Sequence, residues 1–310
     1  MEKIDVFNHI YPPGYYNFFL KRHPMVESMS RELPALIDMD SRLKVMDSLG
    51  VDREILSLAL PSIDDAQAGE EDSRRLTMSA NDSIMEVADR SGGRFLAIGT
   101  VSLSDPAFAV EEAERCVRDL KLLGVQIVSN VKGEPVDLPH FEPFFSVMEK
   151  LNAPVWIHPT FMRERYSWLK DFQTDIMVGW DFDTTLSLIR LAASGLMERH
   201  RQLKIIVHHL GSLVPVLAGR IASFISRPDG DMETVMKSLK SFYVDTAEGM
   251  WNPWLESALK FFGTGHVMFG TDFPWGDSAG IIANIEKSGL SENEMKMVYS
   301  GNAKSTIGFR

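Results

Sequence analysis

The sequence predicts a single (β/α)8 barrel that spans residues 1–310, and three observations support this fold class. Short apolar runs alternate with longer amphipathic stretches along the whole chain, which is typical of parallel strands connected by helices. The runs lack strict polar alternation, as expected for strands that are covered on both faces. Eight such runs occur, the number that a closed barrel needs, and the chain length suits a barrel with insertions.

The predicted elements follow one another in order. Strands are expected at residues 4–7, 54–60, 95–101, 125–128, 155–157, 204–207, 242–244 and 267–269. Helices are expected at residues 38–49, 72–91, 106–123, 141–151, 184–200, 213–225, 253–262 and 279–288. Two long connections, residues 10–36 and 159–183, are expected to lie over the mouth of the barrel as a lid.

An open, doubly wound sheet is the alternative architecture. Such a sheet usually has a glycine-rich turn after its first strand, whereas this chain continues Asn8-His9-Ile10-Tyr11-Pro12-Pro13-Gly14. No dinucleotide-binding or P-loop pattern occurs in the sequence. There is also no internal repeat or low-complexity linker, so one domain is predicted.

The composition excludes several classes of protein. The 32 Lys and Arg residues and 43 Asp and Glu residues give a net charge of −11, which argues against nucleic acid or an anionic membrane surface as a partner. No segment resembles a signal peptide or reaches the roughly 18 apolar residues of a membrane span, so a cytoplasmic location is expected. The single cysteine, Cys116, excludes a disulfide framework within the chain. Any metal site must therefore use histidine and carboxylate ligands.

Polar side chains fall at the carboxyl ends of the predicted strands. The residues at these positions are His9, His158, His208, His209 and Asp272. The strand ends of a barrel converge on one mouth, so these residues are expected to meet there. Histidine and carboxylate ligands around an open position form hydrolytic and Lewis-acid metal sites. Each residue alone is more often structural, so the prediction depends on the whole group.

These motifs resemble the amidohydrolase superfamily, in the branch that contains aminocarboxymuconate-semialdehyde decarboxylase and γ-resorcylate decarboxylase. The resemblance runs nearly end to end and includes Ile4-Asp-Val-Phe-Asn-His-Ile10, Val155-Trp-Ile-His-Pro159, His209-Leu-Gly-Ser-Leu-Val-Pro215 and Phe269-Gly-Thr-Asp-Phe-Pro274. It implies one divalent metal at the mouth, with zinc expected first and manganese second. By position, the implied ligands are residue 7, His9, His158 and Asp272, and His209 is the implied catalytic histidine.

The sequence departs from the family pattern at residue 7. The family's first strand ends His-x-His or Glu-x-His, which places two ligands on one face, whereas this chain has Phe7-Asn8-His9. A phenyl ring cannot bind a divalent metal, so three implied ligands remain. Three protein ligands are enough for catalytic zinc, although weaker binding is expected, and a metal-free site is the alternative. His208 is an additional neighbour whose side chain is expected to point away from that of His209.

The resemblance implies a decarboxylase that acts on an unsaturated or aromatic carboxylate. Asp272 would protonate the carbon that loses CO2, and His209 would orient the substrate or stabilise negative charge. Arg220, within the matching Gly-Arg-Ile motif, is the first candidate to contact the carboxylate, in its own or a neighbouring subunit of an expected homodimer. Phe7 and Trp275 are expected beside the substrate.

Three further possibilities remain open at this stage. Arg163 and Arg165 in the long second connection are weaker candidates for the carboxylate contact. In a hydrolase such as a lactonase, the same mouth would activate water, either through a metal or with Asp272 as a general base. In a non-catalytic descendant, the mouth would only bind a small carboxylate.

Overall fold

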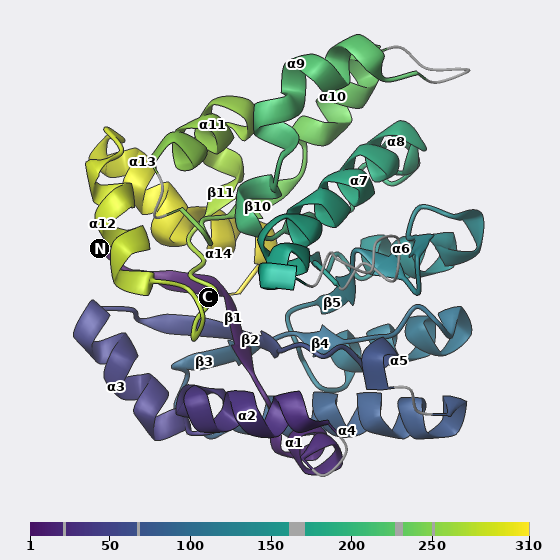
Figure 1. The fold of residues 1–310 in the computed structure, drawn as a ribbon, viewed down its shortest axis with the longest axis vertical. Coiled ribbons are helices and arrows are strands. Elements are labelled where there is room, and N and C mark those ends of the chain that lie inside the picture. The colour runs from purple at the N-terminus through teal and green to yellow at the C-terminus, as the bar shows by residue number, and fades with distance from the viewer. Residues whose placement is uncertain (21–22, 67–68, 161–170, 227–231, 250–251, 310) are drawn as a thin grey trace.

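Parallel strands stand at the centre of the molecule and helices surround them (Figure 1). The computed structural model describes residues 1–20, 23–66, 69–160, 171–226, 232–249 and 252–309. One parallel sheet contains β1 (Ile4–Ile10), β2 (Arg53–Leu58) and β3 (Phe95–Ala97). A second contains, in spatial order, β4 (Gly99–Thr100), β5 (Val125–Val128), β8 (Val155–His158), β9 (Ile205–Val207), β10 (Tyr243–Asp245) and β11 (Val267–Met268).

Backbone hydrogen bonds join the two sheets into one barrel. Strands β3 and β4 form one interrupted strand, separated only by Ile98. At the other junction, the amide of Val6 donates to the carbonyl of Phe269 at 2.9 Å, and that of His9 donates to Phe273 at 2.8 Å. The first strand therefore closes against the last, and the predicted (β/α)8 barrel is confirmed.

Helices cover the outside of this barrel. Those that match the predicted ranges to within a few residues are α3 (Met39–Leu49), α4 (Glu70–Asp89), α5 (Pro106–Arg118), α6 (Glu142–Lys150), α9 (Val214–Phe224), α11 (Asn252–Phe262) and α12 (Ser278–Lys287). The helix predicted at 184–200 is two helices, α7 (Trp180–Ala193) and α8 (Leu196–Arg199), because Gly195 adopts a left-handed φ of 78° between them. Additional short helices are α10 (Met232–Lys240), α13 (Glu292–Lys296) and α14 (Asn302–Ile307).

The first long connection contains two helices, α1 (Pro13–Phe19) and α2 (Pro24–Glu32). Each begins with a proline, whose fixed φ suits the first helical turn. Their buried side chains, Tyr15, Phe19 and Val26, form a separate apolar cluster with residues of β2 and α4. This cluster fixes the connection beside the barrel mouth.

The interior of the barrel below the mouth is filled with side chains. Ile55, Trp156, Ile206 and Met268 form one fully buried cluster there. The indole nitrogen of Trp156 donates to the carbonyl of Val6 at 3.2 Å. The space is therefore a packed core, and substrate access is limited to the mouth. Among the helices in the described parts of the chain, none is both long enough and apolar enough to cross a membrane.

Candidate active site

The residues predicted at the strand ends meet at the carboxyl end of the barrel. His9 Nε2 lies 3.2 Å from Asp272 Oδ1, and His209 Nε2 lies 3.9 Å from Asp272 Oδ2. The ring centroids of His9 and His158 are 5.0 Å apart. The two oxygens of Asp272 thus face different histidines, one on each side of the mouth.

Phe7 lies at the floor of this group. Its side chain is fully buried, and its ring centroid is 4.6 Å from that of His9, 5.8 Å from His158 and 5.5 Å from His209. The ring of His208 stacks on it at 3.4 Å with an interplanar angle of 16°. Phe7 is therefore surrounded by imidazoles and occupies the position where the resemblance implies a metal ligand.

The expectation that His208 points away from His209 is wrong. Both rings contact Phe7, and their centroids are 6.4 Å apart. Strand β9 ends at Val207, and the backbone turns left-handed at His209, with φ of 59°, and at Leu210, with φ of 56°. Strand alternation consequently stops at this point, and both imidazoles lie against Phe7, although only His209 lines the cavity at the mouth.

Neighbouring acceptors hold the Nδ1 atoms of two histidines. His158 Nδ1 donates to the carbonyl of Pro159 at 2.6 Å. His208 Nδ1 lies 2.6 Å from Asp245 Oδ2, and Oδ1 of the same carboxylate accepts from the backbone amides of His209 and Ala247 at 3.1 and 3.0 Å. A proton on Nδ1 leaves a lone pair on Nε2, and Nε2 of His208 is buried without a hydrogen-bond partner.

His9 is held in the same way by a serine. Its Nδ1 lies 2.8 Å from Ser57 Oγ, whose hydroxyl donates to the carbonyl of Asn8 at 2.9 Å. The single hydroxyl proton of Ser57 is donated to Asn8, so Ser57 Oγ can only accept from His9 Nδ1. The proton of His9 therefore lies on Nδ1, and Nε2 presents a lone pair to Asp272 Oδ1. Two acceptors facing each other at this distance require a proton or a metal cation between them.

The protonation of the histidines divides them into two kinds. Burial lowers the pKa of His9, His158 and His208, so these rings are neutral at pH 7. Burial also lowers the pKa of His209, but nearby carboxylates outweigh it and raise this pKa above its ordinary value; they belong to Glu248, Asp272, Asp245 and Asp181. His209 is thus the imidazole best placed to carry positive charge.

A buried arginine supports the seam between β1 and the loop after β11. Arg42 Nη2 donates to the carbonyl of His9 at 2.5 Å, and Nη1 donates to Glu54 at 3.3 Å. The guanidinium also lies 4.8 Å from the ring centroid of Phe273, next to Asp272 in the chain. Arg42 therefore holds the two segments that carry His9 and Asp272.

The mouth opens into a cavity of about 280 Å³. Its apolar walls come from Tyr11, Met25, Met29, Leu60, Ile176, Trp180 and Trp275. Its polar residues are His9, His158, Gln173, His209, Glu248 and Asp272. A small apolar cavity with a few convergent polar groups is typical of a site for a small organic ligand.

Of four further residues predicted to contact the substrate, Trp275 and Arg220 lie within the described residues. Trp275 forms a wall of the cavity, with its ring centroid 5.6 Å from that of His9. Arg220 lies outside the cavity, on the exposed face of α9, with its guanidinium 4.9 Å from the ring centroid of Phe224. The side chains of Arg163 and Arg165 lie outside the described residues.

Sequence reasoning missed Asp245 and Glu248. Asp245 is the last residue of β10, the seventh strand of the barrel, and Glu248 lies in the loop after it, where the strand-end rule would have found them. Asp245 directly follows the strand predicted at 242–244, so the rule that found His158 and Asp272 applies to it as well. Its approach to Phe7 also depends on Gly270, because a Cβ at that position would lie 2.7 Å from the Cβ of Asp245 and 3.0 Å from that of Phe7.

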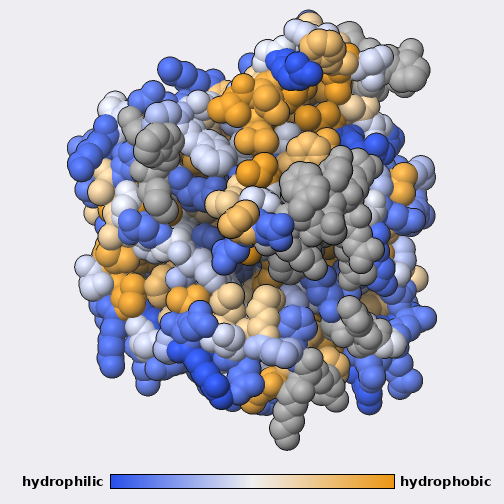
Figure 2. Space-filling view, in the orientation of Figure 1, coloured by the Kyte–Doolittle hydropathy of each residue, from blue (hydrophilic) through white to orange (hydrophobic). Residues whose placement is uncertain are grey.

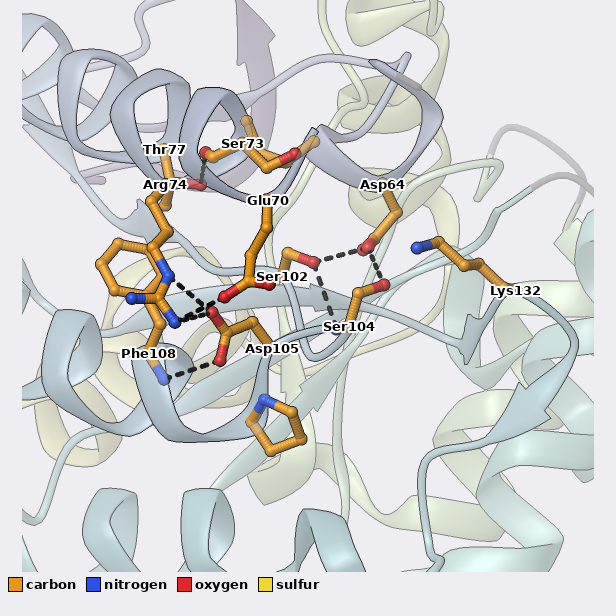
Figure 3. Close-up of a pocket in the computed structure, with 12 residues that line it drawn as sticks. Asp64, Glu70, Ser73, Arg74, Thr77, Ser102, Ser104, Asp105, Phe108 and Lys132 are labelled. Atoms are coloured by element: carbon orange, nitrogen blue, oxygen red, sulfur yellow. Dashed lines mark hydrogen bonds and ion pairs between the residues drawn. The ribbon is translucent and has the colours of Figure 1, made fainter. Parts of the chain in front are cut away.

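A second cavity, of about 400 Å³, lies beside α4 and α5 (Figure 3). Its charged side chains are occupied with one another: Arg74 donates to Asp105 at 2.7 Å and to Glu70 at 3.0 Å. Asp64 accepts from two serine hydroxyls, and Lys132 points toward it. None of the predicted site residues lines this larger cavity, so we place the active site at the histidines.

The donor chemistry at the mouth fits a divalent cation. Neutral imidazole and carboxylate are ligands of zinc and manganese, and buried Nε2 atoms without partners lie at His9 and His208. These donors do not, however, surround a common point. Within the described residues, no three His, Cys, Asp or Glu side chains form a group that could hold a metal ion as they stand. The ring of Phe7 lies among the donors instead.

Fold and site together define a barrel enzyme with an imidazole–carboxylate centre at its mouth. The chain belongs to the amidohydrolase family, whose sequence profile matches residues 4–309. The γ-resorcylate decarboxylase of Rhizobium radiobacter is 32% identical over 260 residues, which cover 77% of this chain and 78% of that protein. The 2-amino-3-carboxymuconate-6-semialdehyde decarboxylase of Dictyostelium discoideum is 30% identical over 288 residues, covering 87% and 77%.

A solved structure shows the same fold. The dihydroxybenzoic acid decarboxylase of Polaromonas sp. JS666, with bound manganese and the inhibitor 2-nitroresorcinol, superposes with a TM-score of 0.85 at 24% identity. The superposition covers 99% of this chain and 97% of that one. These comparisons confirm the amidohydrolase resemblance and the barrel fold.

Proposed function

We propose that the chain is a decarboxylase of a hydroxylated aromatic carboxylate. The observation that carries this proposal is the position of Asp272, between His9 and His209 and open to a cavity whose walls include Trp180 and Trp275. A flat ring fits between such walls, and its carboxylate-bearing carbon would face the carboxyl group of Asp272. The named activities of the two decarboxylase relatives support the same reaction.

Asp272 supplies the proton in this reaction. Its Oδ2 faces His209, whereas its Oδ1 faces His9, so the two oxygens have separate surroundings. Protonation of the ring carbon that bears the carboxylate makes this carbon tetrahedral. The C–C bond then breaks, CO2 leaves, and the electron pair of that bond restores the aromatic ring, with the new hydrogen in place of the carboxylate.

His209 stabilises negative charge during this sequence. Surrounding carboxylates raise its pKa, which favours an imidazolium that can donate to a phenolic or carboxylate oxygen of the substrate. Glu248 lines the same cavity and contributes to that shift. Fixed donors of this kind lower the barrier because they are oriented before charge develops.

For the cofactor, the proposal is a divalent cation, zinc or manganese, at His9, His158 and Asp272. The lone pairs on the imidazoles and the 3.2 Å approach of His9 Nε2 to Asp272 Oδ1 support this assignment. When bound, the cation would supply positive charge to the oxygens of the substrate carboxylate.

Arg220 is proposed to contact the substrate of a second subunit. It lies on the exposed face of α9 beside Phe224, which is 73% exposed, and Val216, which is 57% exposed. Figure 2 shows apolar side chains gathered over α9 and α10. Burial of such a face against a second copy would stabilise a homodimer and carry Arg220 toward the partner's mouth.

Product analysis tests the proposed reaction. The purified chain, with zinc or manganese added in parallel, would be incubated with 2,6-dihydroxybenzoate and its isomers, and CO2 and phenolic products would be measured. The proposal predicts one CO2 for each molecule of phenol formed. Turnover of lactones or esters without CO2, together with inert carboxylates, would instead identify a hydrolase.

A further inference from the structure

His208 has the surroundings of a metal ligand, although the family pattern places none at this position. Its side chain is fully buried, and its Nε2 has no hydrogen-bond partner. A buried polar atom without a partner destabilises the folded protein. A cation bound at Nε2 would remove this destabilisation.

Asp245 holds His208 in the way that carboxylates hold metal-bound histidines in other proteins. Metal-bound histidines usually donate their other ring N–H to a carboxylate or a carbonyl. Here Nδ1 of His208 lies 2.6 Å from Asp245 Oδ2, while two backbone amides hold Oδ1. Both Asp245 and His208 are fully buried, so the pair is fixed within the barrel.

The position of His208 also matches the ligand that is missing from β1. Its ring is stacked on Phe7, so it lies directly beside the place where the family has its first ligand. Its ring centroid is 5.5 Å from that of His158, and His158 is 5.0 Å from His9. Two imidazoles bound to one zinc ion have centroids about 5 Å apart, since each Zn–N bond is about 2.1 Å.

We infer that His208 replaces residue 7 as a ligand of the divalent cation, so that His9, His158, His208 and Asp272 hold it together. This inference rests on the cation of the proposed function and changes its ligand set. The phenyl ring of Phe7 supports one face of His208 and contributes no donor. Because the donors do not form a closed group, binding requires the side chains of His9, His158 and Asp272 to move toward Nε2 of His208, which Asp245 holds in place.

Metal affinity without turnover tests this inference. Dissociation constants for Zn²⁺ and Mn²⁺ would be measured by chelator competition for the wild type, His208→Phe, His158→Phe and Asp245→Asn. His200→Phe is the matched control, because His200 also bonds a carboxylate, Glu149, at 2.9 Å but lies outside the mouth. The visible spectrum of bound Co²⁺ would report the ligand number independently.

His208→Phe and His158→Phe are each expected to lose at least about 100-fold in affinity for Zn²⁺ and Mn²⁺ and to show a changed Co²⁺ spectrum. Asp245→Asn should lose about 10–100-fold and His200→Phe nothing. Wild-type affinity in folded His208→Phe would overturn the inference, as would a wild type that binds neither metal. Circular dichroism would establish folding, and His208→Gln would replace a variant that fails this check.

The outcome is separate from that of the proposed function. A chain that binds the cation through His208 but releases no CO2 from any carboxylate contradicts the proposed function alone. A chain that releases CO2 while His208→Phe keeps wild-type affinity contradicts this inference alone.

Discussion

Strands β1 and β9 are not neighbours in the barrel, but Phe7 of β1 and His208 after β9 stack on each other and have exchanged chemistry. Within β1, Phe7 offers an apolar ring where amidohydrolases of this branch have a metal ligand. Two consecutive histidines follow β9, and the rings of both His208 and His209 lie against Phe7, with that of His208 stacked on it. The loss of a donor on one strand is thus matched by an additional donor on another.

This difference shows that a ligand position at the mouth can be filled from more than one strand. All strand ends of a barrel point to the same space, so a side chain from another strand can reach nearly the same position. Such an exchange needs local backbone changes. Here the left-handed residues from His209 to Ser212 turn β9 inward, and Gly270 gives Phe7 and Asp245 room to approach.

The largest effect on turnover is expected for Asp272, which lies between His9 of β1 and His209 after β9. Asp272→Asn keeps the shape of the side chain but removes the acid, so kcat for CO2 release should fall by at least about 10³-fold. Asp119→Asn, a change at an exposed residue, should have no effect and serves as the control. Unchanged turnover in Asp272→Asn would show that the proton comes from another group.

The second change removes buried support from β1 and from the loop that carries Asp272, and leaves the β9 end intact. Arg42→Met would leave Glu54 without its buried partner and the carbonyl of His9 without its donor. The free energy of unfolding, from urea denaturation, should therefore fall by about 3–5 kcal/mol. The exposed Arg90, paired with Glu86 four residues before it, provides the control: Arg90→Met should change this free energy by less than about 0.5 kcal/mol. Equal effects of both variants would contradict a structural role for Arg42.

The third change restores a donor to β1. Phe7→His should raise Zn²⁺ affinity about tenfold or more, because an additional imidazole would then lie beside His9 and His208. Phe7→Leu removes the aromatic ring without adding a donor and should not raise the affinity. Chelator competition would measure both variants. A similar rise in both would mean that the bulk of Phe7, rather than its missing lone pair, limits binding.

The smallest effect is expected outside both strand ends. Arg220→Met should raise KM for the carboxylate about tenfold and leave kcat nearly unchanged, since a lost charge contact of this kind weakens binding alone. Arg118→Met, on the exposed surface of α5, is the control. An unchanged KM would show that Arg220 does not contact the substrate in either subunit.

The sequence was sufficient to predict the barrel and most of its mouth. The eight strands and the positions of His9, His158, His209 and Asp272 follow from apolar runs and from residues at their ends. The orientation of His208 could not be predicted, because the alternation rule assumes regular strand geometry and the backbone leaves it after Val207. The helices of the first connection were also missed, since their burial depends on contacts with α4 that are distant in sequence.

Isotope labelling tests the central claim most directly. Turnover would be followed in D2O and separately in H2¹⁸O, with mass spectrometry of the organic product. A decarboxylase that uses Asp272 as its acid should place one deuterium on the carbon that lost CO2 and no ¹⁸O in the phenolic product. Incorporation of ¹⁸O into the organic product without CO2 release would contradict decarboxylation and show that this mouth activates water.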